Sequence, residues 1–244
     1  GAVDGKTLME CKGQFWYNTW DYDCWKKAGH GHIGLEDAIT QSCDVFFYKA
    51  GLKTKIEALS QTAFEFGFGK PTLIDLPGEI SGIVPTPDWK EKTKGVYWFP
   101  GNTIQMSIGQ SYLLATPLQM LDMYNMIINN GVVYRPHCVK TVENPAGAQK
   151  HEIAPEVLYR VPLQKKFLQP IKNGLYGVVN QDLGTGRRAR LSGIKVGGKT
   201  ATTQNPHGNT HAAFIGHAPF YNPELSLIVF LEGGGEGGAD AAPV

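Results

Sequence analysis

The sequence lacks any hydrophobic run long enough to cross a membrane. A transmembrane helix needs roughly 18 or more consecutive apolar residues, and the best candidate, 225–231, ends at Glu232 and the glycines beyond it. The first five residues have neither the basic residues nor the apolar stretch of a signal peptide. We therefore expect any targeting or anchoring segment to lie outside this sequence.

An excess of charge of one sign is also missing. The 23 Lys and Arg residues balance 22 Asp and Glu residues, for a formal net charge of +1. This balance gives no electrostatic reason to expect nucleic acid or an anionic membrane surface as a partner. With 42% hydrophobic and 18% charged residues, the composition is typical of a globular chain, and 244 residues suffice for one domain with two lobes.

Cysteines are few, but three of the four share a spacing with one histidine. Cys11, Cys24, His30 and Cys43 form the series C-x12-C-x5-H-x12-C. Three thiols and an imidazole complete a tetrahedral zinc site without an open position, so its role would be structural. The alternative is a Cys11–Cys24 disulfide, with Cys43 simply buried. Cys138 has no evident partner and is expected to be a small buried hydrophobe.

Three-to-four spacing of apolar residues predicts helices in the first half of the chain. One should run from Leu35 to a stop at Gly51, with a break near Ser42. Residues 54–57 have capping-box spacing and predict a helix that ends at Gly67. Two later helices are also predicted. They span 116–130, with an N-cap threonine, a proline and a capping-box glutamine, and 164–180, with a kink at Pro170.

Between and after these helices the pattern changes. Short β-rich runs at 194–202, 212–218 and 225–231 predict three antiparallel strands. The proline-rich stretch 68–104 is expected to be a long surface excursion, and residues 1–34 an irregular loop stapled by their cysteines. The glycine-rich tail after 232 is expected to contribute no core.

Two short motifs carry chemistry. Serine acyl-transferases that react with penicillin combine a nucleophile motif S-x-x-K, a second S-x-N or S-x-D, and a K-[ST]-G on a strand. Ser42-Cys43-Asp44 matches the second motif, and the segment 199–202, Lys-Thr-Ala-Thr, matches the third. The literal S-x-x-K at 192–195 leads directly into the strand of Lys199, so we interpret it as a chance match.

The wider sequence resembles the class B penicillin-binding proteins, and within them the elongation-type penicillin-binding protein 2 group. The resemblance runs from about residue 9 to residue 235. It is carried, in order, by Gly29-His30-Gly31, Ser42-Cys43-Asp44-Val45-Phe46-Phe47-Tyr48, Asp75-Leu76-Pro77-Gly78-Glu79, Ser107-Ile108-Gly109-Gln110 and Ala115-Thr116-Pro117-Leu118-Gln119.

The resemblance implies an α/β penicillin-recognising serine transpeptidase fold, similar to that of β-lactamases, and an incomplete example of it. We expect an irregular, zinc-stapled loop over 1–34, a helical lobe over 35–130 and an antiparallel sheet lobe over 131–244. The family's S-x-x-K serine lies before the start of this sequence, so the chain alone should bind or orient substrate without being acylated.

The implied reaction is D,D-transpeptidation, in which a serine attacks the D-Ala-D-Ala carbonyl of a stem peptide and a neighbouring stem amine resolves the acyl-enzyme. Ser42 and Lys199 are the expected catalytic residues: the Ser42 hydroxyl relays a proton to the leaving amine, and the Lys199 ammonium attracts the substrate carboxylate. Asp44 is expected to orient this network.

The rest of the strand motif is expected to bind substrate. The hydroxyls of Thr200 and Thr202 would donate hydrogen bonds to the carboxylate, and the Thr202 amide would be the second donor of the oxyanion hole. Ala201 departs from the family pattern, which usually has glycine there, and its methyl could crowd the substrate.

The resemblance further implies stem peptides, β-lactams and an elongation-complex glycosyltransferase as partners. It also implies relatives with a metal at the cysteine–histidine series, and a location at the periplasmic face of the bacterial inner membrane. A non-catalytic relative that binds wall peptides or scaffold proteins is the main alternative, and a serine β-lactamase the third. No cofactor is expected for catalysis.

Overall fold

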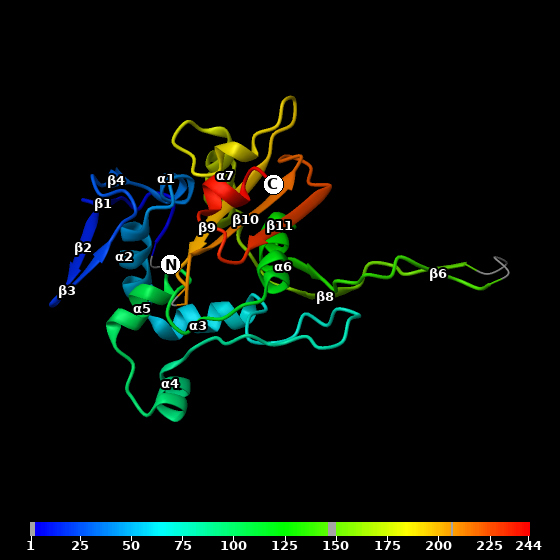
Figure 1. Ribbon diagram of the computed structural model, residues 1–244, viewed down its shortest axis with the longest axis horizontal. Coiled ribbons are helices and arrows are strands. Elements are labelled where there is room, and N and C mark those ends of the chain that lie inside the picture. The colour runs from blue at the N-terminus through cyan, green and yellow to red at the C-terminus, as the bar shows by residue number, and fades with distance from the viewer. Residues whose placement is uncertain (1–2, 146–149, 206) are drawn as a thin grey trace.

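A three-stranded antiparallel sheet lies at the centre of the fold (Figure 1). The computed structural model describes residues 3–145, 150–205 and 207–244. The sheet has the spatial order β11-β10-β9, formed by β9 (Gly197–Thr203), β10 (His211–Ala218) and β11 (Leu225–Leu231). The predicted three antiparallel strands are therefore confirmed, with β9 beginning a few residues later than expected.

Seven α-helices lie within the described residues. They are α1 (Leu35–Thr40), α2 (Asp44–Thr54), α3 (Ile56–Glu65), α4 (Pro87–Lys94), α5 (Pro100–Met106), α6 (Pro117–Ile128) and α7 (Lys165–Asn180). The capping box predicted for α6 is present. Thr116 Oγ1 accepts a hydrogen bond from the Gln119 N–H at 3.1 Å, and Gln119 Oε1 accepts one from the Thr116 N–H at 2.9 Å.

Helix α7 packs between the sheet and α1. Glycine permits the close approach of the two helices, since a Cβ on Gly174 would lie only 2.6 Å from the Cβ of Ile39. The main core lies between α6, α7 and the sheet. Because Ile39 of α1 belongs to this core, α1 holds the start of the turn at Ser42 against it. The buried residues of the main core are Ile39, Tyr124, Ile128, Leu175, Val178, Val179, Val196, Ala212, Phe214, Ala241 and Ala242.

Two predicted helix boundaries are wrong. Gly51 does not stop its helix: it is buried within α2, where a Cβ would clash with the side chain of Ser107 on the facing segment. Because α2 continues to Thr54, this threonine cannot cap the next helix. Lys55, at φ 68°, is the N-cap of α3 and has no side-chain cap hydrogen bond. The predicted break near Ser42 is confirmed, because α1 ends at Thr40.

The first 34 residues are more regular than expected. Four short strands, β1 (Met9–Cys11), β2 (Gln14–Tyr17), β3 (Trp20–Asp23) and β4 (Gly31–Ile33), form two antiparallel pairs, β1 with β4 and β2 with β3. Such three- and four-residue strands are too short to give a clear alternating pattern in the sequence. The prediction of an irregular loop is therefore wrong for the residues of these four strands.

The proline-rich stretch 68–104 contains α4 and α5, which the sequence interpretation missed. Pro87 and Pro100 each occupy the first position of a helix. Proline is favoured there because its missing N–H has no helical partner in any case. The interpretation counted these prolines as turn residues, although Thr86 Oγ1 accepts a capping hydrogen bond from Trp89 N–H at 3.1 Å.

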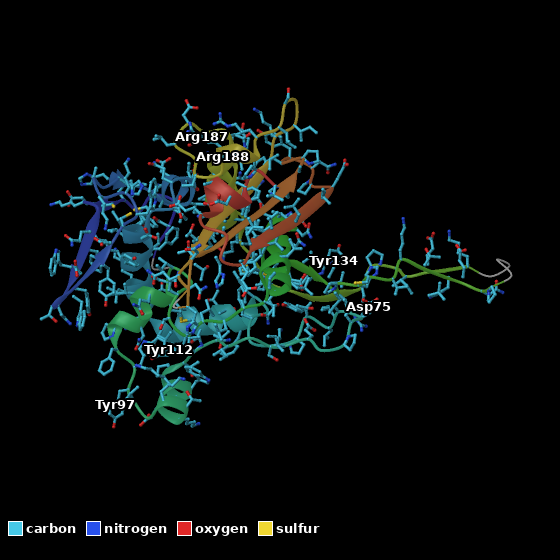
Figure 2. All side chains as sticks on the ribbon, viewed as in Figure 1. Asp75, Tyr97, Tyr112, Tyr134, Arg187 and Arg188 are labelled. Carbon is cyan, nitrogen blue, oxygen red and sulfur yellow. The ribbon has the colours of Figure 1, made fainter. Side chains whose placement is uncertain are left out.

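A long arm extends away from the rest of the molecule (Figure 1). It contains β5 (Val132–Tyr134), β6 (Thr141–Glu143), β7 (Lys150–Glu152) and β8 (Val157–Arg160), with β5 paired to β8 and β6 to β7. Near its base, where Figure 2 labels Asp75 and Tyr134, the Asp75 carboxylate accepts hydrogen bonds from the backbone of Cys138 and Val139 at 2.8 and 3.2 Å. Cys138 is exposed there, so the prediction of a buried thiol is wrong.

The glycine-rich tail does contribute to the core, contrary to expectation. Residues Gly237–Ala241 form a short helical turn against β9 and β10, and Ala241 is fully buried. A Cβ on Gly237 would clash with the backbone of Ala201 and Ala213, so glycine is what lets the tail lie flat on the sheet. None of the helices among the described residues has the length and apolar character needed to span a membrane.

Candidate active site

The two predicted motifs meet at one hydrogen bond. Lys199 projects from β9, and Ser42 lies in the turn between α1 and α2. The Lys199 ammonium donates to Ser42 Oγ at 2.8 Å and to the Thr200 carbonyl oxygen at 2.9 Å. Residues 157 positions apart are thus brought together.

The Ser42 turn has an unusual backbone. Ser42 lies in the left-handed region with φ 52°, which is uncommon for residues other than glycine. Its N–H donates to the Ile39 carbonyl at 3.2 Å, and the Cys43 N–H donates to the Ala38 carbonyl at 2.9 Å. These bonds close α1 and turn the chain so that α2 begins at Asp44.

Asp44 and Lys199 shift each other's titration. Burial raises the pKa of Asp44 to about 6, and the nearby Lys199 opposes this rise. Burial also lowers the pKa of Lys199 to about 8, against the attraction of Asp44. The Asp44 carboxylate accepts a hydrogen bond from the Trp25 backbone N–H at 3.0 Å, and its influence on Lys199 is electrostatic.

The remaining residues of the strand motif line the same cleft. The buried Thr200 hydroxyl lies 2.7 Å from the Thr185 hydroxyl, and either can donate. Thr200 can therefore accept from Thr185 and direct its own proton into the cleft. Thr202 Oγ1 accepts from the Gly237 N–H at 3.1 Å, which leaves its proton available to a ligand. Ala201 is exposed on the cleft wall.

The cleft has a volume of about 1080 Å³. One wall comes from β9 and the C-terminal turn, and the other from β3, the Ser42 turn and the segment after α5. Trp25, Thr185 and Arg188 also line it and were missed by the sequence interpretation. The Arg188 guanidinium, labelled in Figure 2, donates to the Ala239 carbonyl at 2.7 Å. Two signals for Trp25 were available, because it directly follows Cys24 and belongs to the aromatic-rich segment 15–25, whose aromatic residues the sequence interpretation assigned to packing.

The residues of the cysteine–histidine series converge beside this turn. One ligand atom from each of Cys11, Cys24, His30 and Cys43 lies within 4.8 Å of the others. His30 Nδ1 is 3.5 Å from Cys11 Sγ and 3.6 Å from Cys24 Sγ. All three cysteines are buried and free. The alternative of a Cys11–Cys24 disulfide is therefore wrong in this structure.

The pKa values of Cys24 and His30 are shifted towards the protonation states that bind a cation. A hydrogen bond from Cys43 lowers the pKa of the Cys24 thiol well below its usual range. The same bond raises the pKa of Cys43, as does burial. Burial lowers the pKa of His30, which favours the neutral imidazole. A thiolate and a neutral imidazole are the forms in which these side chains ligate metals.

Curated proteins with a named activity are similar to this chain in sequence. The chain is 38% identical over 238 residues to the peptidoglycan D,D-transpeptidase MrdA of Haemophilus influenzae, covering 90% of this chain and 36% of that protein. It is 33% identical over 234 residues to MrdA of Escherichia coli, covering 89% of this chain and 37% of that protein. The chain thus spans little more than a third of the length of these curated relatives.

The fold matches solved penicillin-binding proteins. The structure of Pseudomonas aeruginosa PBP2 in complex with WCK 5153 superposes with a TM-score of 0.87 at 33% identity, covering 100% of this chain and 53% of that one. The complex of PBP2 and MreC from Helicobacter pylori gives a TM-score of 0.84 at 34% identity, covering 97% and 44%. The family described as "Penicillin binding protein transpeptidase domain" matches residues 1–244. The chain therefore belongs to the penicillin-binding protein transpeptidase domain family.

Proposed function

We propose that the protein carrying this chain is a D,D-transpeptidase that crosslinks peptidoglycan stem peptides through a serine acyl-enzyme and acts in cell elongation. The observation that carries the proposal is the 2.8 Å hydrogen bond from Lys199 Nζ to Ser42 Oγ across the cleft. It joins the two motifs that, in this chemistry, attract a substrate carboxylate and relay a proton.

Lys199 and Ser42 divide the work of a single acyl transfer. The ammonium, still charged at neutral pH with a pKa of about 8, attracts the terminal carboxylate of the stem peptide or of a β-lactam. The Ser42 hydroxyl, held by that ammonium, passes a proton to the departing amine, because an amide leaving group must be protonated as it leaves. Asp44 favours the charged form of Lys199.

The β9 edge binds the extended peptide. The Thr200 and Thr202 hydroxyls donate to the carboxylate, and the Thr202 amide serves the oxyanion hole, where one donor is worth about 3 kcal/mol. The methyl of Ala201 narrows the approach to this edge. The nucleophilic serine belongs to the family's S-x-x-K motif, which we place in the protein segment that precedes residue 1. The exposed Ser192 and Lys195 have no part in the reaction, and the chain alone is not acylated.

The cysteine–histidine cluster fits a structural zinc ion. Tetrahedral zinc with Zn–S distances of about 2.3 Å and Zn–N distances of about 2.0 Å separates sulfur from nitrogen by about 3.5 Å. The two measured sulfur–nitrogen separations are 3.5 and 3.6 Å. Cys11, Cys24, His30 and Cys43 would hold the ion with no ligand position left open. A bound zinc would tie the β1–β4 loops to the start of α2 and supply no catalytic chemistry.

The same proposal includes the two lobes of the domain, the cellular location and the partner enzyme. Residues 35–130 form the helical lobe and residues 131–244 the sheet lobe, with the site between them. The protein works at the periplasmic face of the inner membrane beside a glycosyltransferase. In support, a solved structure entitled "Structural coordination of polymerization and crosslinking by a peptidoglycan synthase complex" matches with a TM-score of 0.86 at 28% identity.

Covalent labelling tests the proposal. The intact protein, expressed with its upstream segment, is incubated with a fluorescent penicillin, alongside K199A and the exposed control K195A. Labelling of the wild type and of K195A, with strong loss in K199A, is expected. An unlabelled wild type supports instead the non-catalytic alternative, a relative that binds wall peptides or scaffold proteins. Labelling followed by rapid turnover of a chromogenic cephalosporin would indicate a β-lactamase.

A further inference from the structure

Trp25 brackets the turn that presents Ser42. Its indole N–H donates to the carbonyl oxygens of Gln41 and Ser42, each at 2.9 Å. Its backbone N–H donates to the Asp44 carboxylate at 3.0 Å. Trp25, which belongs to the N-terminal loops, therefore contacts both the backbone of the turn at Gln41 and Ser42 and the first residue of α2, Asp44.

The turn needs such support. With φ 52°, Ser42 adopts a backbone conformation that costs free energy for a residue with a Cβ and persists only where its surroundings impose it. The carbonyls of Gln41 and Ser42 lie between two helices, where the helical hydrogen-bond ladder is interrupted. The indole N–H supplies the donor that both carbonyls share.

Trp25 is itself held by the cysteine–histidine cluster. It follows Cys24 directly, and its ring lies edge-on to the His30 imidazole, with 5.6 Å between ring centroids. Trp25 remains 57% exposed and lines the cleft. Trp25 therefore contacts the cluster through its ring and the Ser42 turn through its hydrogen bonds, and it links the two.

We propose that Trp25 is a positioning residue, which keeps the Ser42 hydroxyl opposite the Lys199 ammonium by fixing the turn through its indole N–H. The cluster then acts as a support for the reaction centre as well as a staple for the loops. The kinetic consequence rests on the proposed transpeptidase function, whereas the geometric consequence does not. Displacing a reacting group by about 1 Å can cost on the order of 100-fold in rate.

An isosteric replacement isolates the N–H. In the intact protein, Trp25→benzothienylalanine keeps the shape of the ring and puts sulfur in place of the donor. The matched control is Trp20→benzothienylalanine, since Trp20 on β3 is 71% exposed. Single-turnover acylation by a fluorescent penicillin separates the acylation rate constant from the dissociation constant. Melting temperature and bound zinc are measured on the same samples, and a crystal structure gives the Ser42–Lys199 distance.

The expected result is an acylation rate constant reduced by about 10- to 100-fold, with the dissociation constant and zinc content equal to those of the Trp20 variant. The Lys199 Nζ to Ser42 Oγ distance should exceed about 3.5 Å, the limit of a hydrogen bond. Three results would overturn the proposal: an unchanged acylation rate constant, an increase in the dissociation constant alone, or a decrease in the acylation rate constant that is proportional to the loss of zinc. If the wild type is not acylated, the proposed transpeptidase function is refuted, whereas the positioning role is still tested by the crystal structure of the variant. A Lys199 Nζ to Ser42 Oγ distance that stays at 2.8 Å in the Trp25 variant would refute the positioning role.

Discussion

Replacing Lys199 by methionine should stabilise the protein at neutral pH while it removes a residue proposed to be catalytic. Burial lowers the pKa of Lys199 from 10.5 to about 8, which corresponds to a cost of about 3 kcal/mol for keeping the charge in the folded state. A neutral amine at this position would still make hydrogen bonds to Ser42 and Thr200, worth about 1 kcal/mol each, and methionine loses both of them. The expected net gain of Lys199→Met at pH 7 is about 1 kcal/mol.

The sign of this difference should change with pH. Because the folded pKa is depressed, the unfolded chain binds more protons between about pH 8 and pH 10.5, and the stability of the wild type rises with pH in this window. The wild type should gain about 2.5 kcal/mol relative to the variant between pH 7 and pH 10 and become the more stable of the two. Urea denaturation at both pH values, with the exposed Lys195→Met as control, measures the difference. A variant that is less stable than the wild type at pH 7, or a difference independent of pH, would refute the reasoning.

Three further predictions concern the site and its supports. Ser42→Ala should lower the acylation rate constant by about 100-fold through loss of the proton relay, measured by stopped flow; a rate within a factor of about two would argue against the relay. Thr116→Ala removes half of the capping box on α6 and should cost about 1 kcal/mol in urea denaturation; no change would mean that water replaces the cap. Purified protein should contain one zinc ion per chain by elemental analysis, and a chelator or Cys43→Ser should remove it and lower the melting temperature, whereas Cys138→Ser should do neither.

Sequence reasoning succeeded where local signals agree with the tertiary environment. The 116–130 helix was predictable because a threonine, a proline and a glutamine at capping positions all favour the same start. The strands β9 to β11 were predictable from their β-rich runs and the turn residues between them. The meeting of Ser42 and Lys199 was expected only through the family resemblance, because no local pattern links residues so far apart.

Two of the failures share a cause, which is that a glycine was interpreted as a helix stop or a tail residue although it permits close packing. Gly51 was interpreted as a helix stop, but it lies where α2 meets Ser107 without room for a Cβ. Gly237 was assigned to a coreless tail, but it allows the chain to approach the backbone of β9 and β10. Such contacts depend on the distant segment that faces each glycine. Trp25 was missed for the same reason, since its role depends on which carbonyls its indole reaches.

The measurement that tests the central claim most directly is a double-mutant cycle on acylation of the intact protein by benzylpenicillin. Because Lys199 donates directly to Ser42, the two side chains should act as a unit. The account predicts that S42A/K199A is acylated little more slowly than the slower of the two single variants. Rate losses that multiply in the double variant would show that the two residues act independently and would contradict the account.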